Sequence, residues 1–340
     1  MGRGKIKELL KLCRLPLSIG ASVTPVIGAL SVKGFLLDNL YFLPLLLLGI
    51  FSNILGFVLN DYLDIKIDEF SEELKDRPLV KKTVSKKTAL IIIFLCSIVI
   101  FSITITFFLK VLAILVLIIS IVLGIFYDVF SKKLIGSETF LACSMAFFCL
   151  FGALAVSDNI NSIYEIGDLT WMVVLIIFFH MFIMNVFEGN LKDADFDRKA
   201  KALTIPIFLG VKINKKMHIT TSFKVLIIVL KIFLVFLVFS TFFFFDLTFW
   251  YWQVFLLILL VIGMIWTTFK ILKMNSFRLD EFAMYARRHG VFSYLLIPVM
   301  LMRFIGINWT LFLILFPASC PLIFNYLLYG KSLIPVAYIK

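Results

Sequence analysis

Two short stretches of the sequence place aspartates at intervals that bring them onto one face of a helix. The first is Asn60-Asp61-Tyr62-Leu63-Asp64-Ile65-Lys66-Ile67-Asp68. On a helix that turns about 100° per residue, Asn60 and the three aspartates after it share an arc of roughly 100°. Because like charges at positions i and i+4 repel each other, this face predicts a surface that binds cations.

A second acidic stretch, Asn190-Leu191-Lys192-Asp193-Ala194-Asp195-Phe196-Asp197, repeats the pattern. On a helix, Asp193 and Asp197 lie within about 40° of each other, and Asn190 counts onto the same face. Asp195 points away from them, and we interpret it as solvated. Glu188 also lies off this face, and we leave it out of the predicted site.

The two stretches offer carboxylate and amide oxygens and contain neither His nor Cys. Hard oxygen ligands suit Mg²⁺, which keeps several waters and is often completed by phosphate oxygens of a substrate. The missing nitrogen and sulfur ligands argue against zinc or copper. Together the stretches predict a site for magnesium and a phosphate compound.

Basic residues beside these stretches fit the recognition of phosphate. Arg77, in the sequence Asp76-Arg77-Pro78-Leu79, can hold phosphate oxygens with two hydrogen bonds. Lys132 follows Tyr127 at the predicted end of an apolar run. The competing interpretation is that these charges set the membrane topology or snorkel to the membrane surface. Arg14, at the mouth of the first apolar run, is compatible with either interpretation.

The elements that position these residues are predicted to be membrane-spanning helices. The chain has 340 residues, 62% of them hydrophobic and 16% charged, whereas a soluble domain has about 25% charged residues. A spanning helix needs about 20 mainly apolar residues. Ten runs qualify, or nine if the last two are one broken pair: 17–37, 41–61, 88–109, 111–127, 138–156, 170–188, 222–245, 250–272, 291–305 and 309–329.

We therefore predict an all-α, polytopic membrane protein with a single domain over residues 1–340. Residues 1–14 are basic and amphipathic, which predicts a short helix lying on the membrane surface. Residues 291–329 form an additional C-terminal helical hairpin. The membrane lipid is an expected partner, and the oligomeric state is left open.

The distribution of Lys and Arg gives the orientation, because short cytoplasmic loops collect positive charge. The N-terminal segment and the loops after every second span contain 25 of the 33 basic residues. We therefore expect these loops, and with them both acidic stretches, in the cytoplasm. Lys331 and Lys340 join that side only if there are ten spans. Topology also explains the net charge of +12, so we expect no nucleic-acid partner.

Both acidic stretches resemble the two aspartate motifs of the UbiA superfamily of membrane prenyltransferases. The first is similar to NDxxDxxxD followed by RPL, and the second to DxxxD, with the run 203–210 after it. The resemblance covers about residues 12–300. It departs from the family where Lys132 follows Tyr127 by five positions instead of four.

This resemblance implies a helical transmembrane fold around a central cavity and Mg²⁺-dependent transfer of a prenyl chain. It implies that the metal ligands are Asn60, Asp61, Asp64, Asp68, Asp193 and Asp197. The residues expected to bind diphosphate are Arg77, Lys132, Lys192 and Asn190. Asp64, Asp193 and Tyr127 are expected to be catalytic, with Asp193 or a neighbouring carboxylate as the base.

The expected substrates are an isoprenyl diphosphate and an acceptor, most simply an aromatic quinone precursor of the hydroxybenzoate or dihydroxynaphthoate type. The first alternative acceptor is the ether lipid used by archaeal digeranylgeranylglyceryl phosphate synthase. A membrane terpene cyclase would use the same motifs without an acceptor. A secondary transporter is a competing class, but transporters place polar residues near the bilayer midplane, whereas here they lie at helix ends.

Overall fold

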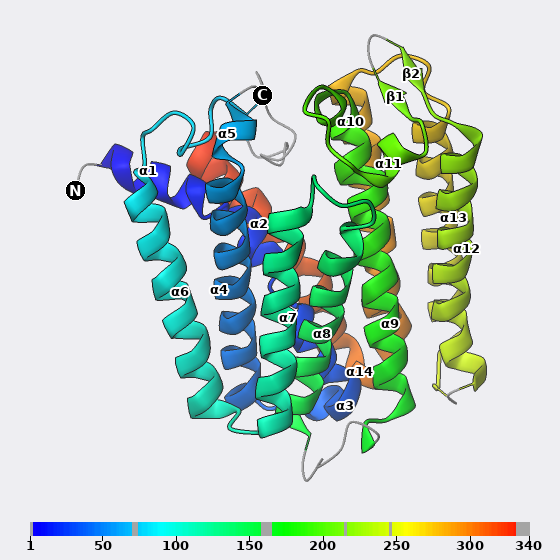
Figure 1. The fold of residues 1–340 in the computed structure, drawn as a ribbon. Helices are drawn as coiled ribbons and strands as arrows, with labels where there is room; N and C mark the ends of the chain where they lie inside the picture. The colour runs from blue at the N-terminus through cyan, green and yellow to red at the C-terminus, as the bar shows by residue number, and fades with distance from the viewer. Residues whose placement is uncertain (1–2, 70–73, 158–164, 214–215, 245–246, 331–340) are drawn as a thin grey trace.

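Figure 1 shows the computed structural model of the chain, in which long helices run side by side. The structure describes residues 3–69, 74–157, 165–213, 216–244 and 247–330. The helices of the first half are α1 (Arg3–Leu12), α2 (Leu15–Gly20), α3 (Thr24–Lys33), the 3₁₀ turn η1 (Gly34–Leu36), α4 (Asn39–Leu63), α5 (Ile65–Asp68), α6 (Lys86–Phe107), α7 (Val111–Phe130) and α8 (Glu138–Val156).

The second half continues with α9 (Asp168–Ile183), the π-turn η3 (Met184–Gly189), α10 (Asn190–Lys199), α11 (Ile205–Phe208), β1 (Lys212–Ile213), β2 (Met217–His218), α12 (Thr221–Phe244), α13 (Tyr251–Leu272) and α14 (Leu279–Tyr329). The two strands pair antiparallel and form a small hairpin. The predicted all-helical bundle is confirmed.

Nine helical segments among the described residues are long and apolar enough to cross a membrane, with α14 counted once. Many of their large apolar side chains are exposed, among them Phe94 and Leu95 on α6 and Val111 on α7. Such a surface is unfavourable in water and matches the hydrocarbon of a bilayer. The chain is therefore an integral membrane protein with several spans, as predicted.

Glycines allow the N-terminal helices to approach closely. A Cβ on Gly28 of α3 would lie 1.8 Å from the carbonyl oxygen of Cys149 on α8, and a Cβ on Gly152 of α8 would lie 1.8 Å from that of Pro25. A Cβ on Gly49 of α4 would lie 2.0 Å from the carbonyl oxygen of Ser22. Small residues at such crossings are typical of helices in membranes, and here they fix the position of α4, which carries the first acidic stretch.

The last helix, α14, is broken at Gly306, whose φ of 81° and ψ of 163° are not helical. In Figure 1 its first leg runs from the end of the bundle near α10 toward α3, and its red second leg returns toward α1 and α2. The predicted hairpin over 291–329 thus corresponds to part of α14, whose first leg begins earlier, at Leu279. Lys331 and Lys340 lie outside the described residues.

One end of the bundle collects the short elements. α1, α5, α10, α11 and the β1–β2 hairpin all lie there, and α1 crosses the direction of the long helices (Figure 1). α5 continues α4, and α10 continues α9 through η3. Both acidic stretches are therefore at the same end of the bundle, as the sequence predicted.

Candidate active site

The first acidic stretch leaves the bundle through a sharp break instead of a continuous helix. α4 ends at Leu63, Asp64 is its C-cap residue, and α5 follows at once. The amide of Asp64 still donates to the carbonyl of Asn60 at 2.9 Å, and that of Asp68 to Asp64 at 2.8 Å. The chain therefore keeps turning through the break, and the carboxylates of Asp61, Asp64 and Asp68 are all buried.

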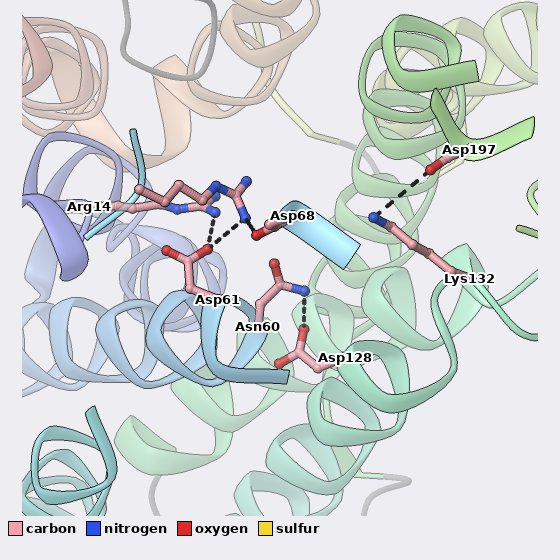
Figure 2. A network of polar contacts seen from close by, with 8 residues as sticks. Arg14, Asn60, Asp61, Asp68, Asp128, Lys132 and Asp197 are labelled. Atoms are coloured by element: carbon pink, nitrogen blue, oxygen red, sulfur yellow. Dashed lines mark hydrogen bonds and ion pairs between the residues drawn. The ribbon is translucent and has the colours of Figure 1, made fainter. Parts of the chain in front are cut away.

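Two arginines lie against these carboxylates (Figure 2). Arg77 forms an ion pair with Asp68 and places Nη1 3.0 Å from Oδ1 of Asp61. Arg14 forms an ion pair with the same oxygen of Asp61. It lies between α1 and α2 in the left-handed backbone region, with φ 42°. Arg14 therefore reaches the first acidic stretch.

The end of α7 supplies a second side to the site. Nδ2 of Asn60 donates to Oδ1 of Asp128 at 3.3 Å, and the hydroxyl of Tyr127 donates to Oδ1 of Asn185 in η3 at 3.3 Å. Asp128 was missed in the sequence. The signal was a carboxylate directly after the apolar run, next to Tyr127, where an unpaired acid at the membrane boundary is costly.

The second acidic stretch lies across from the first, on α10. Asp197 is only 2% exposed, and its Oδ1 lies 3.9 Å from Nζ of Lys132. Lys132 also sits over the ring of Phe196, 5.3 Å from its centroid. Figure 2 shows this pair across from Asp61 and Asp68. The five-residue spacing from Tyr127 therefore does not remove Lys132 from the site.

The other aspartates of α10 differ in exposure. Asp193 has a side chain 47% exposed and lies 3.4 Å from Nζ of Lys192. Asp195 pairs with Lys199 at 2.8 Å on the outer surface, in line with its predicted solvation. Asp193 and Asp197 thus do not share one buried environment, although the sequence placed them on one helix face.

Asn190 is held by a residue that sequence reasoning missed. Its Nδ2 donates to Oε1 of Glu138 at 2.5 Å, and the amide of Ile205 donates to the same oxygen at 3.1 Å. Glu138 is the first residue of α8 and is fully buried. A buried carboxylate that accepts these bonds ties α8 to both ends of the second motif. Its position at the start of an apolar run was the available signal.

The electrostatics join the two acidic stretches through Lys132. Burial raises the pKa of Asp64, while the positive charges of Lys132 and Arg77 act in the opposite direction. Burial also raises the pKa of Asp68 to about 6, against the charge of Arg77. Because the charge of Lys132 acts to lower the pKa of Asp64 against the effect of burial and its Nζ also pairs with Asp197, carboxylates of both stretches interact electrostatically with one cation.

The donor set fits magnesium and diphosphate in type. Asp197 Oδ1 and Glu138 Oε2 are buried and accept no hydrogen bond, and Asn185 Nδ2 is a buried donor that makes none. Within the described ranges, no three His, Cys, Asp or Glu side chains are already grouped around a metal position. Instead, arginines neutralise Asp61 and Asp68. Binding of Mg²⁺ would therefore require these side chains to regroup.

The fold and the site define an all-helical integral membrane protein with an acidic centre, lined by Arg and Lys, at one end of the bundle. Residues 21–284 match the UbiA prenyltransferase family, and the chain belongs to that family. It is thus a membrane prenyltransferase, as the resemblance of the motifs implied.

Two curated relatives, both 4-hydroxybenzoate octaprenyltransferases, match parts of the chain. The protein from Shewanella pealeana is 31% identical over 134 residues, which are 38% of this chain and 46% of that protein. The protein from a Marinomonas species is 34% identical over 91 residues, which are 26% of this chain and 32% of that protein. The matched part thus spans less than half the length of these relatives.

Solved structures match over most of the chain. A UbiA homolog from Aeropyrum pernix has a TM-score of 0.68, 17% identity, and coverage of 84% of this chain and 97% of that one. A UbiA homolog from Archaeoglobus fulgidus bound to GPP and Mg²⁺ has a TM-score of 0.61 and 16% identity, and the match covers 86% of this chain and 98% of that one. A structure of digeranylgeranylglyceryl phosphate synthase has a TM-score of 0.61 and 20% identity, and the match covers 89% of this chain and 98% of that one. At these identities the likeness shows the fold.

Proposed function

We propose that the protein transfers a prenyl group from an isoprenyl diphosphate to an aromatic quinone precursor, of the hydroxybenzoate or dihydroxynaphthoate type, in a Mg²⁺-dependent reaction. The single observation that carries the proposal is the meeting of two acidic stretches around Lys132. The ammonium group of Lys132 pairs with Asp197, and its positive charge favours the ionised form of Asp64, which acts to lower the pKa of that carboxyl against the effect of burial. The similarity to 4-hydroxybenzoate octaprenyltransferases supports the aromatic acceptor.

The proposed metal ligands are the oxygens of the two stretches: Asn60, Asp61, Asp64, Asp68, Asp193 and Asp197. The homolog from Archaeoglobus fulgidus binds GPP and Mg²⁺, which supports a metal at the corresponding end of this bundle. Bound Mg²⁺ would neutralise charge on the diphosphate oxygens as the leaving group departs. Arg14 and Arg77 would exchange their carboxylate partners for phosphate oxygens when the aspartates turn to the metal.

The diphosphate would be held by Arg77, Lys132, Lys192 and Asn190. Breaking the bond between C1 of the prenyl chain and its oxygen leaves positive charge on the chain and negative charge on the diphosphate. Arg77 and Lys132 stabilise the departing charge. Asn190, whose amide nitrogen donates one hydrogen to Glu138, would contribute its remaining N–H. The surrounding helices exclude water, which would otherwise capture the prenyl cation.

The acceptor then attacks C1 and loses a proton. We assign proton acceptance to Asp193 or a neighbouring carboxylate, because the half-exposed side chain of Asp193 can pass the proton to water. Tyr127 points from α7 toward η3 and is proposed to position substrate through its hydroxyl. Asp64, at the break between α4 and α5, is the proposed central ligand of the first stretch.

A second candidate acceptor is a geranylgeranylglyceryl phosphate. The fold matches 98% of the length of a digeranylgeranylglyceryl phosphate synthase structure, which favours keeping this candidate. Both acceptors would use the same diphosphate site, and they differ only in the nucleophile presented to C1. We place the active site on the cytoplasmic side, because the basic N-terminal segment and loops lie at the same end as the acidic stretches (Figure 1).

The test is a product assay with purified protein, Mg²⁺ and geranylgeranyl diphosphate. Three acceptors are supplied in parallel: 4-hydroxybenzoate, dihydroxynaphthoate and geranylgeranylglyceryl phosphate. A prenylated aromatic product that disappears on addition of EDTA is expected. A product only with the phosphate acceptor would assign the ether-lipid reaction, and hydrocarbon formed without acceptor would assign a cyclase. Absence of any diphosphate release would contradict the proposal.

A further inference from the structure

A buried charged network lies away from the acidic stretches, between α12, α14 and η3. His289 of α14 contacts Glu188 through Nδ1 and Lys231 of α12 through Nε2. All three side chains are at most 5% exposed. Lys231 also lies over the ring of Phe187, 4.7 Å from its centroid. The reaction proposed above uses none of these residues.

The hydrogen bonds of this network have one consistent direction. An ammonium group has donors only, so Nζ of Lys231 donates to Nε2 of His289. The Nδ1–H of a neutral His289 then donates to the carboxylate of Glu188. One positive and one negative charge are thus joined through a neutral imidazole, which gives a buried network with no net charge. Breaking it by removing one partner leaves a buried charge uncompensated.

Glu188 belongs to the π-turn η3, which connects α9 to the second acidic stretch. The amide of Asn190 donates to the carbonyl of Asn185, a bond over five residues. A π-turn contains one residue more than a regular α-helical turn and is frequent at functional sites. The extra residue rotates everything after it by about 100° relative to an uninterrupted α-helix. The turn therefore decides which way Asp193 and Asp197 face.

The π-turn is held from two sides. Asn185, near its beginning, accepts a hydrogen bond from Tyr127 of α7 at 3.3 Å. Glu188, near its end, is bound by His289 of α14. A Cβ on Gly290, beside His289, would lie 3.5 Å from Oε2 of Glu188, so this carboxylate also lies next to α14 at Gly290.

We propose that Glu188, His289 and Lys231 are positioning residues that clamp the π-turn and thereby fix the rotation of α10. Through this clamp α12 and α14 determine whether Asp197 faces Lys132 and the first acidic stretch. The catalytic consequence rests on the proposed function, but the rotation itself does not. Loss of the clamp lets the turn relax toward an α-helix and turns the second acidic stretch away.

The experiment measures the rotation directly, through the accessibility of Ala194. This residue is fully buried on α10. The substitution Ala194→Cys is introduced into the full chain, and labelling by a water-soluble maleimide is measured site by site with mass spectrometry. Native Cys149, which is also fully buried, reports global unfolding. Burial raises the pKa of Cys13 to about 11, which keeps its background reaction slow.

With the clamp intact, position 194 is expected to be protected. Glu188→Ala is expected to raise its labelling rate by about tenfold or more, because the turn opens locally, while Cys149 stays protected. Glu188→Gln keeps an oxygen for His289 and is expected to restore protection. The matched control is Ser293→Ala, which removes a neighbouring 2.9 Å hydrogen bond between α14 and His180 of α9, and it should leave position 194 protected.

Two results would overturn the clamp: unchanged protection of position 194 in Glu188→Ala, or equal exposure in Ser293→Ala. If Glu188→Ala exposes Cys149 as well, the double variant Glu188→Met with Lys231→Met is labelled instead. This variant removes both buried charges, which usually preserves folding. The clamp predicts that position 194 is labelled in it while Cys149 stays protected, and protection of both would overturn the clamp. Failure of the proposed function would appear separately, as a wild-type protein that is protected at 194 yet releases no diphosphate from geranylgeranyl diphosphate.

Discussion

Asp64 and Asp193 are the proposed catalytic aspartates, one from each acidic stretch. We expect Asp64→Ala and Asp193→Ala each to reduce prenyl transfer by about 10²- to 10³-fold, the usual cost of losing one preorganised electrostatic group in an active site. The measurement is the rate of diphosphate release at saturating Mg²⁺. Neither substitution should alter the melting temperature strongly, because each removes a carboxylate from a region already crowded with negative charge.

The matched control is Asp195→Ala on the same helix. Asp195 pairs with Lys199 at the surface, and exposed ion pairs contribute little. Its activity should stay within about twofold of the wild type. Wild-type rates in Asp64→Ala or Asp193→Ala would refute the site, and a large loss in Asp195→Ala would show that any charge change on α10 is harmful.

Arg77 separates the role of charge from that of geometry. Its Nη1 contacts both Asp61 and Asp68, which leaves the other guanidinium donors for substrate, and a lysine lacks the planar fork that binds phosphate oxygens in a bidentate manner. We expect Arg77→Lys to raise the KM for the prenyl diphosphate by about tenfold with a smaller change in kcat. Lys81→Gln, at a surface ion pair with Asp76, is the control, and an equal rise in KM there would contradict the assignment.

At the scale of elements, backbone contact between helices carries the position of the site. Gly28→Ala or Gly152→Ala would place a methyl group 1.8 Å from a carbonyl oxygen of the facing helix. We expect each to lower the free energy of unfolding by on the order of 1–3 kcal/mol, since a packed helix pair must separate. The melting temperature of the detergent-solubilised protein measures this change.

Gly56→Ala is the control for these substitutions, because a Cβ on Gly56 of α4 meets no atom within 4 Å. Replacing this glycine within a helix should leave stability unchanged or raise it slightly, owing to the better helix propensity of alanine. Equal melting temperatures for Gly28→Ala and Gly56→Ala would show that close approach of α3 and α8 is not required.

The helices themselves were predictable, because apolar runs of span length have few other uses. The local breaks were not. The C-cap at Asp64 has no Pro or Gly that would demand it, and the single glycine of the π-turn, Gly189, is not by itself a signal for a π-turn. Tertiary contacts hold them: Arg77 draws Asp68 back toward Asp61, and His289 binds Glu188. Asp193 and Asp197 still share a face of α10, but tertiary packing buries Asp197 and leaves Asp193 47% exposed, a difference that rotation about one helix does not predict.

The candidate site was predictable where ligands are close in sequence and incomplete where they are distant. The spacing of the aspartates pointed to both stretches. Asp128 and Glu138 were missed, since each meets its amide partner, Asn60 or Asn190, only through folding. Glu188, which we leave out of the predicted ligands, turns toward α14 and contacts His289.

For the whole molecule, the break at Gly306 decides how many times the chain crosses the membrane. At 1.5 Å per residue, the legs 279–305 and 307–329 are about 40 and about 35 Å long. Each exceeds the roughly 30 Å of hydrocarbon in a bilayer. A Cβ on Gly34, which follows α3, would lie 2.9 Å from the carbonyl of Phe304, so this turn lies at the end of the bundle opposite the active site.

We therefore expect ten crossings, with the N-terminal segment and the end of α14 both in the cytoplasm. A fluorescent protein fused to the end of the full chain should fold and fluoresce, and alkaline phosphatase fused there should be inactive. Ile307→Cys, beside the turn and 53% exposed, should react with a membrane-impermeant maleimide in intact cells, with the parent protein as control.

An active phosphatase at the chain end would mean an odd number of crossings, and α14 would then cross only once. If the phosphatase is inactive but position 307 reacts only after the cells are opened, α14 would instead dip into the membrane and return. In either case the basic loops at the acidic end (Figure 1) would stay in the cytoplasm, because they precede the break at Gly306, and only the path of the chain after that break would change.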